Sequence, residues 1–329
     1  MIRTRLTQAF DLDHPIVSAP MAFAAGGKLA SAVTQAGGLG LIGGGYGDTD
    51  WIEEQFRQAG NTKVGAGLIT WKLAEQPQVL DKVLACNPAV MFLSFGDPSP
   101  FVDAIAEAGV PLICQVQTLR DAQHAARAGA KAIVAQGAEA GGHGERRATF
   151  TLVPEVADWL RAHAPDTLLL AAGGVADGRG LAAALMLGAD GVLVGSRFWA
   201  SEEANVSDAM SDAAIAATGD QTIRSSVMDK ARFLNWPARY TARVLRNAFT
   251  ERWHNDLDGL MAQAEAQSAQ WMDGWNAGDP ERANTFVGEA TGLIHDRPAA
   301  HEIIKKMVAD AEALAGGAAD WICPQGTDL

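Results

Sequence analysis

The first two-thirds of the chain alternates between short apolar runs and longer amphipathic stretches that are rich in alanine and leucine. Each apolar run ends in a glycine or a polar cluster, and successive runs begin roughly 20–30 residues apart, the length of a strand with its following helix. This repeat predicts strands that alternate with helices. The predicted strands are Ile16–Pro20, Leu39–Gly44, Val64–Ile69, Ala89–Phe95, Pro111–Val116, Ala132–Gly137, Leu168–Gly174 and Gly191–Ser196.

Some predicted strands are apolar at every position, for example over residues 168–172 and 192–194. A parallel sheet that is covered by helices on both faces requires such strands. Strand–helix units without a long antiparallel interruption favour an α/β protein built as a closed (β/α)₈ TIM barrel. An open, doubly wound sheet is the alternative architecture.

The strand–helix repeat stops after Trp199. Residues 203–298 show no clear strand, and a barrel helix must still follow the eighth strand, for which Ala300–Leu314 is the last good candidate. We therefore expect residues 1–204 and 299–329 to form the barrel, and residues 205–298 to form an inserted helical module that covers the cleft or forms a homodimer face. Its predicted helices are Ser207–Thr218, Ala238–Ala248, Leu257–Asn276 and Pro280–Val287.

Composition narrows the class of protein without identifying it. The formal net charge is −13, and without a basic stripe to neutralise phosphates a nucleic-acid partner is not expected. The cysteines number three and form no CxxC pair, which argues against a disulfide framework and against a zinc site. The amino terminus lacks an apolar signal segment, and no run of about 18 apolar residues occurs. We expect a cytoplasmic protein with neither a membrane partner nor a bound metal.

The most informative segment is QGAEAGGHG, which runs from Gln136 to Gly144 directly after the sixth predicted strand. In a TIM barrel this position lies at the catalytic face. The glycine pair Gly141 and Gly142 lets the backbone approach a ligand, and His143 can act as a base or a hydrogen-bond donor near neutral pH. The alternative is a glycine-rich turn with a surface histidine.

The ends of the seventh and eighth strands form a second feature. Ala172, Gly173 and Gly174 close one strand, and Gly195 and Ser196 close the other. TIM barrels commonly bind phosphate with the loops that follow these two strands, and the backbone N–H groups of glycines are unobstructed there. A phosphate site is therefore predicted, although each glycine could also serve only a tight turn.

Two weaker signals lie at other strand ends. Ala19, Pro20, Met21 and Ala22 follow the first strand, where a proline and a flexible thioether suit the edge of a planar cofactor. Gln115 is a polar amide in an otherwise apolar fifth strand. It satisfies either the polar edge of a cofactor ring or its own neighbours.

Together these motifs resemble the nitronate monooxygenase family over most of the chain. The segment 136–144 is the most specific part, and segments 172–178 and 195–198 are similar to the family's FMN-phosphate elements. The other segments that carry the resemblance are residues 14–21, 36–40, 236–237, 240, 243 and 246–249.

The resemblance implies a barrel with non-covalent FMN and a histidine, here His143, that acts on the substrate beside the flavin. Such enzymes oxidise an alkyl nitronate with O₂ to a carbonyl compound and nitrite. Related flavoproteins carry a lysine at or near the fifth strand, where this chain has Gln115, so contact with the polar edge of the flavin is expected to differ. Many relatives have threonine where this chain has Ser196, which is a conservative change. The expected FMN site comprises Ala19, Pro20, Met21, Ala22, Gln115, Gln136, Gly141, Gly142, Ala172, Gly173, Gly174, Gly195 and Ser196.

The AGGH signature is shared with NAD(P)H:quinone reductases and flavin-dependent enoyl-thioester reductases, which are the alternative function. A nitronate enzyme needs a small apolar pocket, which Met21, Phe23, Trp71 and Phe95 would line together with His143. A reductase must admit nicotinamide and then its acceptor, and it needs a more open cleft. A third possibility is a barrel that binds FMN or a phosphate ligand without catalysis.

Overall fold

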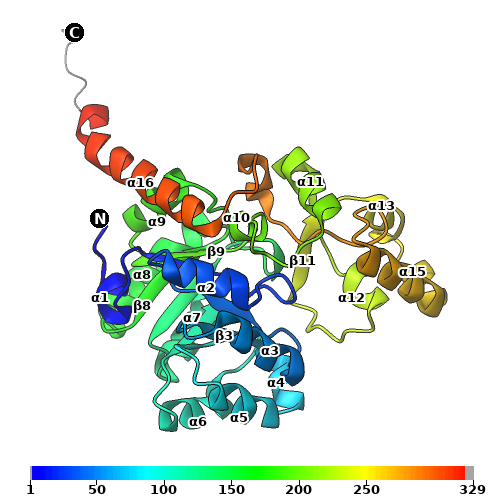
Figure 1. Ribbon diagram of the computed structural model, residues 1–329, viewed down its shortest axis with the longest axis horizontal. Coiled ribbons are helices and arrows are strands. Elements are labelled where there is room, and N and C mark those ends of the chain that lie inside the picture. Colours follow the sequence, from blue (N-terminus) through cyan, green and yellow to red (C-terminus); the bar gives the residue numbers. More distant parts are fainter. Residues whose placement is uncertain (1, 323–329) are drawn as a thin grey trace.

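Eight parallel strands form a closed barrel in the computed structural model, which describes residues 2–322 (Figure 1). Hydrogen bonds link them in the order β1-β9-β8-β6-β5-β4-β3-β2, and a parallel bridge between Val17 and Leu39 closes the ring. The strands are β1 (Ile16–Ser18), β2 (Leu41–Gly43), β3 (Gly65–Ile69), β4 (Met91–Ser94), β5 (Leu112–Val116), β6 (Ala132–Gln136), β8 (Leu168–Ala172) and β9 (Gly191–Val194). Each of the predicted strands overlaps one of them, which confirms the TIM-barrel prediction and excludes the open sheet.

The barrel is filled by one hydrophobic cluster and surrounded by another. Side chains such as Leu41, Phe92 and Leu170 point inward and pack with Leu6 of α1 (Arg5–Phe10), which closes the amino-terminal end of the barrel. The outer cluster packs the strands against a ring of helices. These helices are α2 (Gly27–Gln35), α3 (Thr49–Ala59), α4 (Thr70–Glu75), α5 (Gln78–Ala85), α6 (Val102–Glu107), α7 (Leu119–Arg127), α8 (Thr149–His163), α9 (Gly178–Met186) and α16 (Ala300–Ile322).

Helix α16 is the expected final barrel helix, and it packs against α9 and α2. It continues beyond the predicted end at Leu314, as far as Ile322. Two short helices lie at strand ends, η1 (Ser99–Phe101) after β4 and α10 (Ser196–Trp199) after β9. Within the described residues no helix is both long and apolar enough to cross a membrane.

The segment between α10 and α16 forms a second hydrophobic cluster beside the barrel, away from the end that α1 closes (Figure 1). We call residues 205–298 the module. Helix α11 lies where Ser207–Thr218 predicted it, and α14 and α15 divide the predicted helix Leu257–Asn276. The elements of the module are α11 (Asp208–Ala216), η2 (Gly219–Gln221), β10 (Thr222–Ser225), α12 (Val227–Ala231), β11 (Thr241–Leu245), α13 (Ala248–Trp253), α14 (Leu257–Ala262), α15 (Ala264–Ala277) and η3 (Glu289–Leu293).

The expectation that residues 203–298 contain no strand was wrong. The predicted helix Ala238–Ala248 is instead strand β11, which pairs antiparallel with β10 on one side and with β7 (Gly142–Gly144) on the other. Ala242 and Val244 are buried while Arg243 is not, an alternation typical of a strand. Pairing partners distant in sequence override the helix propensity of alanine, arginine and leucine.

The helix predicted over Pro280–Val287 is also absent, and the chain is irregular there. Asn284 and Thr285 are fully buried. The Asn284 side chain accepts a hydrogen bond from Trp271, and the Thr285 carbonyl accepts one from the Leu245 amide. Such side-chain and backbone bonds compete with helix formation.

Candidate active site

A cavity of about 370 Å³ lies at the carboxyl ends of the barrel strands, between the barrel and the module. Its size suits a small-molecule ligand. All residues predicted to lie at the catalytic or cofactor site line this cavity, namely Ala19, Pro20, Met21, Ala22, Gln115, Gln136, Gly141, Gly142, His143, Ala172, Gly173, Gly174, Gly195 and Ser196. Phe23 and Phe95 line it as expected, but Trp71 does not, because its ring packs behind the wall against Tyr46 and Trp236.

The ends of β8 and β9 form an open glycine cradle. Gly173 and Gly174 both have left-handed backbones, with φ of 100° and 78°. A Cβ added at Gly195 would meet only ordinary contacts, 3.7 Å from Ala19 and 3.9 Å from Met21. The Ser196 Oγ accepts a hydrogen bond from the Gly288 amide at 2.9 Å, which leaves its own proton free to donate. This set of backbone and hydroxyl donors fits an anionic group such as a phosphate.

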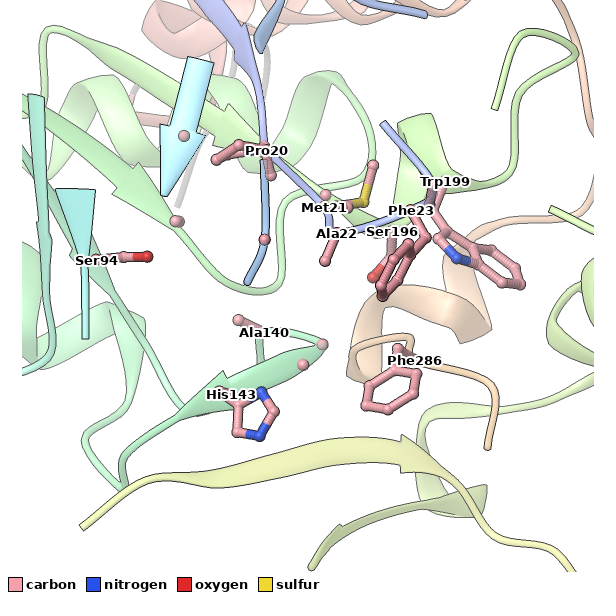
Figure 2. Close-up of a pocket in the computed structure, with 18 of the residues that line it drawn as sticks. Pro20, Met21, Ala22, Phe23, Ser94, Ala140, His143, Ser196, Trp199 and Phe286 are labelled. Carbon is pink, nitrogen blue, oxygen red and sulfur yellow. The ribbon is translucent and has the colours of Figure 1, made fainter. Parts of the chain in front are cut away.

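The opposite part of the cavity carries a polar pair that the sequence did not reveal in full. Ser94 of β4 and Gln115 of β5 are register neighbours, and both line the cavity. Neither side chain makes a hydrogen bond within the described residues, and Figure 2 shows Ser94 pointing into the cavity. Two free polar side chains on adjacent strands suit the polar edge of a ring. The sequence indicated Gln115 but not Ser94, which reads as an ordinary strand residue.

His143 lies on β7, the strand that joins the barrel to the module, where it pairs with Ala242. Figure 2 shows it across the cavity from Pro20, Met21 and Ala22. Gln136 donates a hydrogen bond to the His143 carbonyl at 3.1 Å and accepts one from Gln117 at 2.8 Å. The amide of Gln136 is therefore used to hold the strand that carries the histidine.

The two predicted glycines of this loop serve different purposes. A Cβ at Gly141 would come within 2.6 Å of the Gly288 backbone, so glycine is required there for close packing against the module. Gly142 has φ of 69° with no atom within 4 Å of an added Cβ, so its requirement is conformational.

The His143 ring is held by a buried carboxylate and by a tryptophan. Its Nε2 lies 2.9 and 3.1 Å from the two oxygens of Asp229, and its ring stacks on Trp236 with centroids 3.4 Å apart. Burial lowers the pKa of His143, and the bond to Asp229 offsets this only in part. The ring is thus neutral near pH 7, with Nε2–H donating to Asp229. Nδ1 makes no hydrogen bond within the described residues, so its lone pair is free to take a proton.

Asp229 also binds Arg232, whose Nη2 donates to Oδ1 at 2.9 Å. Asp229 is 1% exposed, and both of its partners line the cavity. The sequence patterns did not indicate Asp229, Arg232 or the contact of Trp236 with His143. The one available signal was an acidic residue directly after the apolar pair Val227 and Met228.

Two further arginines of the module hold the loop before β7. The Nε atoms of Arg224 and Arg243 both donate to the Ala138 carbonyl, at 3.2 and 3.0 Å. Burial lowers the pKa of Arg224 to about 10, and Glu289 pairs with Arg243 at 2.8 Å. The module therefore contributes the surroundings of His143 and also the position of its loop. No cluster of His, Cys, Asp and Glu suited to a metal ion occurs among residues 2–322.

The cavity is large enough for a small-molecule ligand and lies at the strand ends of a TIM barrel. Together with the anion cradle and the buried histidine, this arrangement is typical of the TIM-barrel class of enzymes. The family model described as nitronate monooxygenase matches residues 3–67 and 62–310. The chain belongs to the nitronate monooxygenase family and is an oxidoreductase.

Individual relatives agree with this assignment. A nitronate monooxygenase of Neurospora crassa is 32% identical over 90% of this chain and 89% of its own length. A probable nitronate monooxygenase of Staphylococcus aureus is 28% identical over 90% of this chain and 94% of its own.

Two solved structures have the same fold. FabK from Thermotoga maritima superposes with a TM-score of 0.83 at 29% identity and covers 98% of this chain and 100% of its own. A nitroalkane oxidase from Streptomyces ansochromogenes reaches a TM-score of 0.78 at 23% identity, over 94% and 99% of the two chains, and supports the fold alone.

Proposed function

We propose that this protein is an FMN-dependent nitronate monooxygenase, which oxidises alkyl nitronates with O₂ to a carbonyl compound and nitrite. The observation that carries the proposal is the position of His143. His143, with its free Nδ1 and its buried partner Asp229 behind it, lines the same cavity as the glycine cradle of β8 and β9. A base and an anion cradle at one cavity are what a flavin enzyme acting on a weak carbon acid needs.

The residues of the cavity fit FMN. The cradle at Gly173, Gly174, Gly195 and Ser196 would hold the phosphate, since its N–H groups and hydroxyl are donors and an added Cβ at Gly174 or Gly195 would meet nothing closer than 3.6 Å. Ser94 and Gln115 would hold the polar edge of the ring, and Pro20 and Met21 would lie against the ring. When bound, the flavin supplies the acceptor for the electrons of the nitronate, and the protein supplies orientation and charge.

The chain's own residues then have defined roles. His143 removes the α-proton of a neutral nitroalkane at Nδ1, and Asp229 holds the Nε2–H tautomer and stabilises the charge on the protonated ring. A substrate that arrives as a nitronate needs no such step. Phe95 and Trp236 cover the ring of His143 and limit access of water.

A second candidate is an FMN-dependent NAD(P)H oxidoreductase that acts on a quinone or an enoyl thioester. It is favoured by the extent of the cavity, which continues past Ser196 along Trp199, Met210, Trp275 and Phe286 (Figure 2 labels Trp199 and Phe286 there). Phe23 at this part of the cavity is 45% exposed. An open cleft of this kind would admit a larger reactant than a simple nitronate.

The proposal is tested by a visible spectrum of the purified protein and an oxygen-electrode assay with simple alkyl nitronates, in which nitrite is also measured. We expect a flavin spectrum, release of FMN on heating, and O₂ uptake with nitrite formation. Anaerobic mixing with NADH or NADPH separates the candidates. Rapid bleaching of the flavin, without nitronate oxidation in air, would replace the proposal with the reductase.

A further inference from the structure

We propose that Arg232 binds the two oxygens of the nitronate, and that Asp229 holds Arg232 and His143 on one carboxylate as a single acid–base and anion-binding unit. The inference rests on the proposed function and specifies how the substrate is recognised. Arg232 follows helix α12 and lines the cavity. Its side chain is 14% exposed, so it is largely desolvated without being closed off.

The guanidinium of Arg232 uses some of its five N–H donors within the protein and leaves others free. Its Nε donates to the Met228 carbonyl at 3.0 Å, and Nη2 donates to Asp229 at 2.9 Å. A further N–H of Arg232 donates to the Tyr46 hydroxyl, and the remaining N–H groups make no other hydrogen bond within the described residues. The group also lies 5.2 Å above the ring of Trp271 and 5.4 Å from that of Phe286, which fix the plane of the fork. Free N–H donors held in a fixed plane at a cavity are suited to a ligand.

Tyr46 supplies a second donor on the same side. Its hydroxyl accepts a hydrogen bond from Trp236 Nε1 at 3.1 Å, so its own proton remains available. Burial raises the pKa of Tyr46, and the charge of Arg232, together with the hydrogen bonds from Trp236 and Arg232, partly offsets that rise. Both hydrogen bonds end on the hydroxyl oxygen, so its proton stays free. Tyr46 and Arg232 both line the cavity.

The charged side chains that line the cavity indicate which kind of ligand it binds. Among the described residues that line the cavity, Arg232 alone has an arginine or lysine side chain. The one acidic lining residue, Glu139, is occupied by the amide and hydroxyl of Thr149. A nitronate is planar and shares its negative charge between two oxygens, as a carboxylate does. The planar fork of arginine matches that geometry, whereas lysine offers only a point charge.

The carboxylate of Asp229 links Arg232 and His143 into one functional unit. Asp229 neutralises Arg232 before the substrate binds and orients Nε2–H of His143 at the same time. When His143 takes the α-proton of a nitroalkane, negative charge develops on the nitro oxygens. Arg232 then stabilises that charge without rearrangement, because its position is already fixed.

The test uses the flavin-loaded enzyme and isobutyrate, the carboxylate isostere of propane-2-nitronate, which cannot be oxidised in the same way. Calorimetric titration gives its affinity, and steady-state assays give KM for propane-2-nitronate. Arg232→Lys keeps the charge but loses the planar fork. We expect the Kd of isobutyrate and the KM for propane-2-nitronate both to rise by about 10- to 100-fold, as for the loss of a charge-assisted hydrogen bond. Flavin content and unfolding temperature should be retained.

Arg239→Lys is the matched control, since Arg239 also lies over an aromatic ring, that of Tyr240, and pairs with Asp121, but does not line the cavity. It should leave both values unchanged. If Arg232→Lys does not fold, Tyr46→Phe is the second test variant. It should raise KM for propane-2-nitronate several-fold. Unchanged isobutyrate and nitronate binding in Arg232→Lys, or in Tyr46→Phe if the former is unfolded, overturns the inference.

Failure of the proposed function looks different. In that case the wild-type enzyme does not oxidise propane-2-nitronate at all, whereas the anion subsite is still revealed by isobutyrate binding that Arg232→Lys weakens. If the wild-type enzyme oxidises the nitronate but isobutyrate neither binds nor competes with it, the proposed function stands and the anion subsite at Arg232 is wrong.

Discussion

Trp236 of the module lies flat against His143 of the barrel loop, with ring centroids 3.4 Å apart and planes 5° from parallel. The same indole donates a hydrogen bond to Tyr46, which follows β2. One side chain of the module therefore contacts two barrel loops at the cavity. The stack restricts rotation of the imidazole, so that the direction of its Nδ1 lone pair is set by the module.

Trp236→Leu should therefore impair catalysis more than cofactor binding. We expect turnover of neutral nitroalkanes to fall by about 10-fold, because a mobile imidazole is less often aligned with the substrate. The free energy of unfolding should fall by about 1–2 kcal/mol, since a stacked aromatic pair contributes about 0.5–1.5 kcal/mol beyond its buried area. Trp236→Phe keeps a ring over His143 and is the control. Equal turnover in Trp236→Leu and the wild type would show that the stack does not orient His143.

Sequence patterns predicted the barrel well because its strands are specified locally. Runs such as Leu168–Ala172 are apolar throughout, and each is followed by glycine and an amphipathic helix. The same regularity placed the glycine cradle and His143 at strand ends, where the structure brings them to one cavity.

The module was less predictable because its structure depends on distant partners. Strand β11 pairs with β10 and with β7, the latter about a hundred residues earlier, and its short polar–apolar alternation does not by itself distinguish it from a helix. Asp229 meets His143 for the same reason: 86 residues separate them, and contacts distant in sequence, the β7–β11 pairing among them, bring α12 to the barrel loop. The partner of a predicted catalytic residue was thus the part of the site that sequence could not supply.

The phosphate cradle is best tested at Gly195. Gly174→Val would combine two effects, because φ of 78° at Gly174 also strains a β-branched residue in the apoprotein. Gly195 has φ of −102°, and an added Cβ meets nothing closer than 3.7 Å. We expect Gly195→Ala to lower FMN occupancy about 10-fold or more while the unfolding temperature of the apoprotein is unchanged. Gly316→Ala, in an open position on α16, is the control. Full FMN content in Gly195→Ala would remove the cradle from the cofactor site.

The pH dependence of nitroalkane oxidation should report the environment of His143. Burial favours the neutral ring, so its pKa is lowered and the base remains active below the ordinary histidine pKa of about 6.5. The value of kcat/KM for a neutral nitroalkane should rise with pH through this lowered pKa and then level. Asp229 raises the pKa of the ring, and in Asp229→Asn the acid limb should move to still lower pH.

The height of the kcat/KM plateau in Asp229→Asn tests which tautomer His143 adopts. The side-chain amide that Asp229→Asn introduces can donate to Nε2, which would place the proton on Nδ1 and remove the free lone pair. We therefore expect the plateau to fall by about 10²-fold, within the contribution of a general base. An acid limb at the same pH in both enzymes would show that His143 is not the titrating base.

His143→Asn separates the two roles that the histidine could have. Asparagine keeps a hydrogen-bonding group beside Asp229 but cannot act as a base near neutral pH. FMN content and the visible spectrum should be retained, since the cradle and the Ser94–Gln115 pair lie on other strands. Oxidation of neutral nitroalkanes should fall by about 10²–10⁴-fold, the usual contribution of a general base. Pre-formed nitronates need no deprotonation, so their turnover should fall much less. Steady-state assays with 2-nitropropane and with its nitronate measure the two losses side by side. Equal losses would mean that His143 acts through binding or charge, and no loss on either substrate would return it to a histidine of a glycine-rich turn.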